Sequence, residues 1–139
     1  MRNDLFRTAL TTFFIYCLLS VSVSAFAAET RIEKAIPEGG KAVLTFDTDK
    51  LLTMTETPFS MEVIGGTGKV FKNAAVSLRL VMPAMSMPVN RPKTIWLDNA
   101  YRGQAVFTMA GEWNAIMIIN RPGYDPIDLT FKLGLVQMK

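Results

Sequence analysis

Three methionines occur within six residues of a proline-rich segment, VMPAMSMPVNRP, which spans residues 81–92. They are Met82, Met85 and Met87, and they lie between Pro83, Pro88 and Pro92. Thioether sulfur is a soft, neutral ligand that favours Cu(I) over hard ions such as Mg²⁺ and binds without losing a proton. The spacing therefore raises the hypothesis of a Cu(I) site built from methionine side chains.

The prolines predict the backbone conformation of this segment. Each proline fixes its own φ and biases the preceding residue toward the β region, so we expect an extended chain from Met82 to Pro88. Residues two apart in an extended chain point the same way. Met85 and Met87 can therefore project together, with Met82 entering from the end of a strand.

Core packing and partner binding are the two alternatives to a metal site. Methionine fills irregular gaps in cores, and Met82 continues the apolar alternation of Leu78 and Leu80. Exposed methionines also suit adaptable binding surfaces. Clustering in the sequence does not separate a metal site from a partner surface.

The chain offers few residues for other chemistry. It has no histidine and one cysteine, Cys17, which lies inside an apolar N-terminal segment. No serine or threonine stands in a nucleophile-elbow context, and the carboxylates are scattered, so we expect no enzymatic activity. The acidic residues around Asp47 and Asp125 lack the density of a calcium-binding loop and are interpreted as turns. The basic residues form no run, which is not the pattern of a nucleic-acid-binding protein.

Residues 1–27 have the pattern of an export signal. Arg2 and Arg7 precede a mostly apolar run over residues 10–23, and a small-x-small motif ends at Ala27. We expect cleavage after Ala27; an uncleaved anchor is the alternative, although the run is shorter than the roughly 20 residues that span a bilayer. Cleavage would leave an exported, periplasmic domain without cysteine and without a membrane span.

Short segments rich in β-branched, aromatic and aliphatic residues predict seven strands. They are residues 41–47, 59–65, 74–82, 93–98, 103–110, 113–120 and 126–137. Several alternate between apolar and polar side chains, as in the segment that begins at Phe59. Residues 28–40 are polar and contain Pro37, so we expect them to form a leader before a folded domain of residues 41–139.

About seven antiparallel strands in roughly 100 residues predict an all-β, immunoglobulin-like antiparallel sandwich, with a small barrel as the alternative. We expect a hairpin over residues 103–120, where Gly111 can supply a positive φ. Trp113 is expected to be the central aromatic residue of the sandwich. Tyr101 is expected to bond to the backbone at a strand corner.

Two segments in this order resemble the YtkA-like and FixH-like exported β-sandwich domains. They are GKVFKNAAVSLRLVMPAMSMP and YRGQAVFTMAGEWNAIMII, and the resemblance covers about residues 58–133. The matching residues are Met82, Pro83, Met85, Tyr101, Met109, Gly111 and Trp113. The sequence differs at Ala100, where the family commonly has glycine, and at Met87-Pro88, where the family often has a histidine.

The resemblance implies an envelope protein associated with copper supply to respiratory oxidases or with metal efflux. It also implies that Met109 lies near the loop as a fourth ligand. Tryptophan is the best aromatic ring for a cation–π contact, so Trp113 or Trp96 is a candidate to cap the ion. We therefore expect a Cu(I)-binding accessory protein whose partner is a metalloenzyme-assembly or efflux component. The alternative is a non-catalytic protein-interaction domain whose methionines lie in the core or against a partner.

Overall fold

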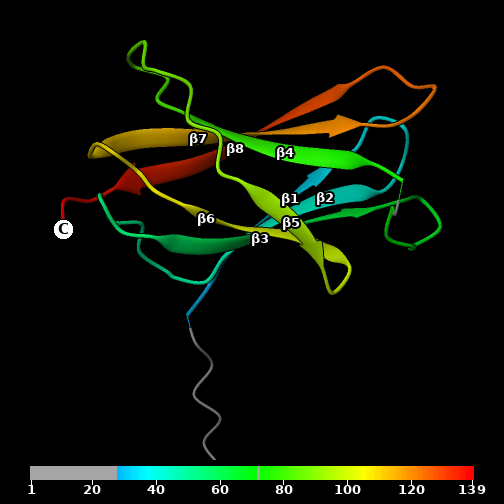
Figure 1. Cartoon of the computed structure of the whole chain (residues 1–139), viewed down its shortest axis with the longest axis horizontal. Coiled ribbons are helices and arrows are strands. Elements are labelled where there is room, and N and C mark those ends of the chain that lie inside the picture. Colours follow the sequence, from blue (N-terminus) through cyan, green and yellow to red (C-terminus); the bar gives the residue numbers. More distant parts are fainter. Residues whose placement is uncertain (1–27, 72) are drawn as a thin grey trace, which may run out of the picture.

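The described part of the chain folds as two antiparallel sheets packed face to face (Figure 1). The computed structural model describes residues 28–71 and 73–139. Its strands are β1 (Thr30–Ala35), β2 (Lys41–Phe46), β3 (Thr57–Ile64), β4 (Ala75–Val81), β5 (Thr94–Leu97), β6 (Ala100–Ala105), β7 (Gly111–Asn120) and β8 (Ile127–Val136). One sheet has the order β1-β2-β3-β6-β5 and the other β4-β7-β8. The predicted all-β sandwich is confirmed.

The N-terminal segment contributes to the fold more than its polarity indicated. Residues 28–40 were expected to form a leader, but β1 within them pairs with β2 along its whole length. An edge strand needs few inward apolar residues, and here Ile32 and Ile36 supply them while the other side chains face water. The predicted signal peptide, residues 1–27, lies outside the described residues.

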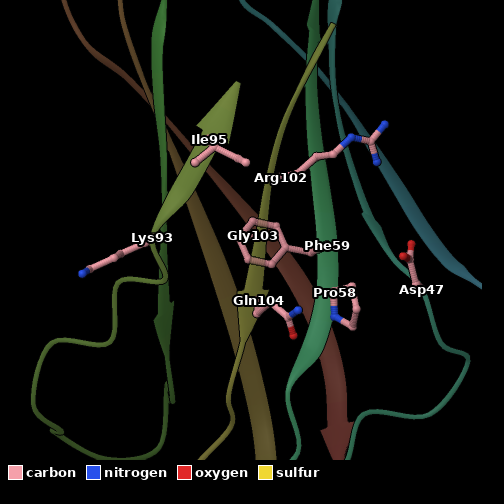
Figure 2. Close-up of a pocket in the computed structure, with 8 residues that line it drawn as sticks. All are labelled: Asp47, Pro58, Phe59, Lys93, Ile95, Arg102, Gly103 and Gln104. Carbon is pink, nitrogen blue, oxygen red and sulfur yellow. The ribbon is translucent and has the colours of Figure 1, made fainter. Parts of the chain in front are cut away.

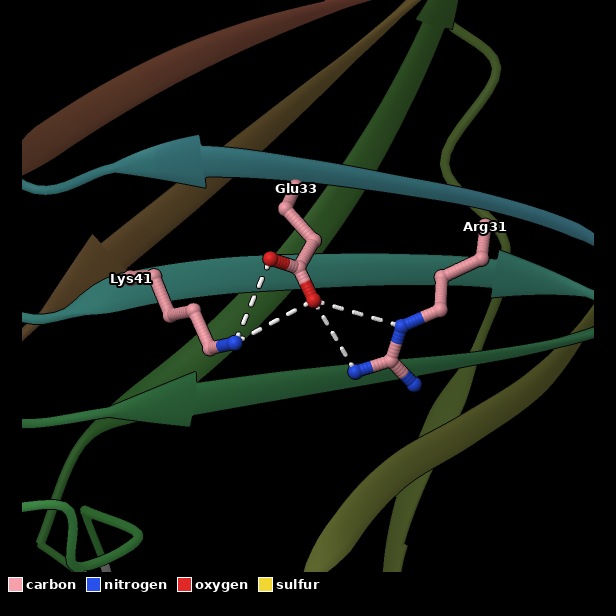
Figure 3. Close-up of polar contacts among 3 residues, drawn as sticks. All are labelled: Arg31, Glu33 and Lys41. Atoms are coloured by element: carbon pink, nitrogen blue, oxygen red, sulfur yellow. Dashed lines mark hydrogen bonds and ion pairs between the residues drawn. The ribbon is translucent and has the colours of Figure 1, made fainter.

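Charged side chains on the outer surface of β1 and β2 form a small ion-pair group. Figure 3 shows Arg31 and Lys41 converging on Glu33, with N–O distances of 3.1 Å and 3.2 Å. Hydrogen bonds from Arg31 and then Lys41 lower the pKa of Glu33. All three side chains are exposed, so the group contributes little to the free energy of unfolding.

The core lies between the two sheets and follows the alternation of the strands. In β3, Phe59, Met61 and Val63 are buried, while the residues between them are more exposed. In β7 the buried positions begin at Trp113 and recur at every second residue to Ile119. The predicted alternation in these segments is therefore confirmed.

The expected hairpin over residues 103–120 is wrong. β6 ends at Ala105 in the five-stranded sheet and β7 begins at Gly111 in the three-stranded sheet, so residues 106–110 cross from one sheet to the other. Gly111 does have a positive φ of 133°. A glycine turn between two apolar strands is compatible with a crossover as well as with a hairpin. Only the packing of the two sheets determines which connection forms.

The sharpest hairpin of the five-stranded sheet joins β5 to β6. Leu97 pairs with Ala100, and the two residues between them, Asp98 and Asn99, have φ values of 52° and 59°. Two consecutive positive φ angles are characteristic of a type I′ turn, whose twist matches that of the strands. β5 is thereby held at the edge of the sheet.

Candidate functional site

The methionine loop begins with a turn. The Met85 amide donates to the carbonyl oxygen of Met82 at 3.4 Å, so the chain is not extended throughout from Met82 to Pro88 as the prolines predicted. The φ that proline imposes also suits the second position of a β-turn, which is where Pro83 lies. The φ angle of Pro83 is therefore compatible with a turn as well as with an extended chain.

Two hydrogen bonds fix the far side of the loop. The Leu80 amide donates to the carbonyl oxygen of Asn90 at 2.9 Å, which brings the end of the loop back to β4. The Asn90 side-chain amide donates to the carbonyl oxygen of Val106 at 3.0 Å. The loop is thus attached to the crossover segment that leads to Met109.

The four predicted ligands differ in burial. Met82 is 8% exposed and belongs to the core, where its Cε lies 2.8 Å from the position that a Cβ on Gly111 would occupy. Met85 and Met109 are each 45% exposed. Met87 is partly buried and packs against the core. Three of the four side chains are therefore accessible to solvent, and Met82 has the surroundings of a packing residue.

The structure brings the loop and the Met109 segment to one end of the sandwich. A groove of about 410 Å³ is lined by residues from both, including Met87, Asn90, Val106 and Thr108. In Figure 1 this end carries the yellow-green loop after β4, the start of β7 and the C-terminus. Val106 and Thr108, which precede Met109 in the chain, therefore line the same groove as Met87 and Asn90 of the loop.

The two tryptophans occupy different environments. Trp113 is fully buried, its ring meets Phe107 edge-on at 5.3 Å, and its indole N–H donates to the carbonyl oxygen of Met109 at 2.9 Å. The prediction that Trp113 is a central core residue is confirmed. Trp96 lies on β5 and meets Tyr101 at 4.8 Å. The hydrogen bond from the Trp113 indole thus fixes the backbone of Met109, a candidate ligand.

The structure places two further exposed methionines, Met54 and Met138, at the same end, and the sequence prediction did not include them. The Met54 amide donates to the carbonyl oxygen of Phe107 at 2.8 Å, and Met54 itself has a φ of 52°. Met138 follows Gln137, whose carbonyl oxygen accepts from the Thr53 amide at 2.9 Å. Neither methionine belongs to a cluster in the sequence, so only the pairing of distant segments reveals them.

We use the name methionine end for the part of the sandwich formed by residues 51–57, 82–90, 106–111 and 136–139. All four exposed methionines in the described part of the chain are found there: Met54, Met85, Met109 and Met138. Within residues 28–71 and 73–139, no three His, Cys, Asp or Glu side chains gather in a group that could hold a metal ion. No helix in these residues has the length and apolarity required to cross a membrane.

Comparisons of the chain with protein-family models, with curated proteins and with solved structures found no match. The resemblance to YtkA-like and FixH-like domains therefore stays a prediction.

Proposed function

We propose that this protein is an exported, non-catalytic metal-handling accessory protein that binds Cu(I) through Met85, Met87 and Met109. The observation that carries the proposal is the placement of three accessible thioethers on two segments joined by the Asn90–Val106 hydrogen bond. Thioethers are soft ligands that select Cu(I) over harder ions. Its partner would be an envelope component that supplies or receives the ion.

Met82 has a supporting role in this proposal. Its buried side chain packs beneath the loop and against Gly111, two residues after Met109. A buried anchor under an exposed loop limits the positions that Met85 and Met109 can take relative to each other. Preorganised ligands lose less conformational entropy when an ion binds.

The ligand set predicts that binding responds weakly to pH. Thioethers carry no proton, in contrast with the thiolates, imidazoles and carboxylates that bind most metals in proteins. A site of this kind holds Cu(I) in mildly acidic conditions in which histidine ligands become protonated.

The test is a competition titration of the protein with Cu(I) and bicinchoninate under anaerobic, reducing conditions. The triple variant Met85→Leu, Met87→Leu, Met109→Leu keeps the apolar volume and removes the sulfur atoms. We expect it to bind Cu(I) at least about tenfold more weakly than wild type, which corresponds to about 1.4 kcal/mol. Equal affinities of wild type and triple variant would refute the proposal.

A matched control removes thioethers from the same end but outside the proposed site. The variant Met54→Leu, Met138→Leu replaces two exposed methionines that lie on other segments. We expect its Cu(I) affinity to stay within about twofold of wild type, since neither residue is a proposed ligand. A large loss in this control alone would move the site to the other side of the methionine end.

Protein interaction is the second candidate function, and the exposure of Met54 and Met138 favours it. Flexible apolar side chains on a surface adapt to the shape of a partner. In that case Leu, which is similarly apolar, preserves partner binding at all four exposed positions, whereas metal binding requires sulfur. The same leucine variants therefore distinguish the two functions.

A further inference from the structure

The edge strand β5 exposes three consecutive apolar side chains. Ile95, Trp96 and Leu97 are between 41% and 64% exposed, and the strand contains no charged residue. Proteins that remain monomeric usually protect edge strands with charges, prolines or bulges inside the strand. An unprotected apolar edge of this kind is typical of an interaction surface.

The turn chemistry determines which backbone groups of β5 are free. In a two-residue hairpin the residues that flank the turn, here Leu97 and Ala100, form a hydrogen-bonded pair. Bonding alternates along an antiparallel pair, so Ile95 also directs its amide and carbonyl toward β6. Thr94 and Trp96 consequently direct theirs to the open edge, where an added strand can bond to them.

We propose that the β5 edge pairs antiparallel with the β5 edge of a second copy of this chain, joining the two five-stranded sheets. A two-fold axis perpendicular to the sheet places residues of the same face opposite each other. With the axis at Trp96, the two tryptophans face each other and Ile95 faces Leu97 of the second copy. Apolar residues then lie opposite apolar residues from Ile95 to Leu97.

Charges at the two ends of β5 favour this arrangement over a parallel one. Lys93 precedes the strand and Asp98 follows it, and neither forms an ion pair with another described residue. Figure 2 shows the Lys93 side chain extending away from the other labelled residues. Antiparallel pairing brings each Lys93 toward the acidic turn of the second copy, and parallel pairing would bring like charges together.

The outer face of the sheet is hollowed next to β5. A groove of about 500 Å³ beside Ile95 is lined by Pro58, Arg102, Gly103 and Gln104, among others (Figure 2). A Cβ on Gly103 would lie 2.3 Å from the Lys93 carbonyl oxygen, so the backbone before β5 approaches β6 closely at this point. Leu97 of the second copy would pack on Ile95 at the rim of this groove.

The size of the edge predicts a weak dimer. A four-residue strand buries less than the roughly 1,000 Å² typical of stable interfaces. We therefore expect a dissociation constant between about 10 µM and 1 mM. Sedimentation velocity over this concentration range should show an average mass that rises from monomer toward dimer.

A charge variant tests the location of the interface. Ile95→Lys should weaken dimerisation at least about tenfold, because each lysine would be buried opposite the apolar Leu97 of the second copy and would lie diagonally across the axis from the other lysine. The matched control is Leu135→Lys, on the exposed part of the edge strand β8, which should dimerise as wild type. Equal weakening by both variants would contradict an interface at β5.

A disulfide provides the second measurement. In a Cys17→Ser background the substitution Trp96→Cys introduces the only thiol, next to its own copy across the axis. We expect a disulfide-linked dimer under mild oxidation, in clear excess over the same experiment with Leu135→Cys. A protein that stays monomeric to about 1 mM and crosslinks no better than this control would overturn the proposal. That result would assign the edge to a strand from a different protein.

Discussion

The two ends of the sandwich are built with different chemistry. At the end opposite the methionine end, Arg121 forms an ion pair with Glu38 and lies over the rings of Phe71 and Tyr124, at 5.2 Å and 4.3 Å from their centroids. At the methionine end, backbone hydrogen bonds and the Asn90 side chain join the segments, and four methionine side chains are exposed. Side-chain contacts stabilise the fold at the Arg121 end. At the methionine end, exposed side chains are free to contact a ligand.

This difference separates residues that stabilise from residues that can bind. The hydroxyl of Tyr101 donates to the carbonyl oxygen of Ala74, which ties β6 to the start of β4 at the Arg121 end. The side chains of Met85 and Met109 are each 45% exposed and carry no hydrogen-bond donor. Substitutions should therefore affect the free energy of unfolding at one end and ligand binding at the other, with Met82 as the exception.

The largest expected effect is at Met82. Met82→Ala should lower the free energy of unfolding by about 2–5 kcal/mol, because it leaves a cavity between the sheets. Met85→Ala, three residues later on the exposed loop, should change it by no more than about 0.5 kcal/mol. Urea denaturation measures the unfolding free energies of both variants and of wild type. Equal losses would show that the loop is part of the core and would remove the distinction between anchor and ligand.

A smaller effect is expected at Arg121. Arg121→Ala should cost about 1–2 kcal/mol of unfolding free energy, since it removes a largely buried guanidinium from two rings and an ion pair. Arg121→Lys keeps the charge but not the planar contact, so it should recover only part of the loss. The Cu(I) affinity should be the same in both variants, because the residue lies at the other end.

The smallest effect concerns Tyr101 and depends on pH. Burial raises the pKa of Tyr101 in the folded protein. Its contribution to stability is therefore fully present below the unfolded-state pKa of about 10 and is lost as pH rises through the folded-state value. Tyr101→Phe should cost about 1 kcal/mol at neutral pH.

The comparison of the two proteins across pH isolates this effect. The difference in unfolding free energy between wild type and Tyr101→Phe should shrink above about pH 10, as the wild-type hydroxyl loses its proton. Urea denaturation at a series of alkaline pH values measures the difference. A constant difference through this range would mean that the Ala74 hydrogen bond does not carry the stability.

Alternation along the chain was sufficient to predict the fold class and most strands. β3 and β7 have apolar side chains at every second position because each faces the core on one side. β1 escaped prediction because an edge strand can be mostly polar and still pair through its backbone. The crossover between β6 and β7 was missed for a different reason: a positive φ at Gly111 suits a hairpin and a crossover equally.

The candidate ligands were predicted only as far as they cluster in the sequence. Met82, Met85 and Met87 belong to one loop, so their type and spacing were enough to raise the hypothesis. Burial of Met82 and exposure of Met85 could not be read from that spacing, because the turn at Pro83 decides which side chain faces the core.

The sequence by itself determined most of the strands and the supply of soft ligands, because these depend on residue type and on neighbours along the chain. The tertiary structure alone decided that Met54 and Met138 join the methionine end, that the loop is attached to the segment leading to Met109, and that β5 is left at an edge. The physical reason is that these placements depend on hydrogen bonds between segments up to 86 residues apart in the sequence, as between Leu51 and Gln137, and no local preference encodes such a pairing.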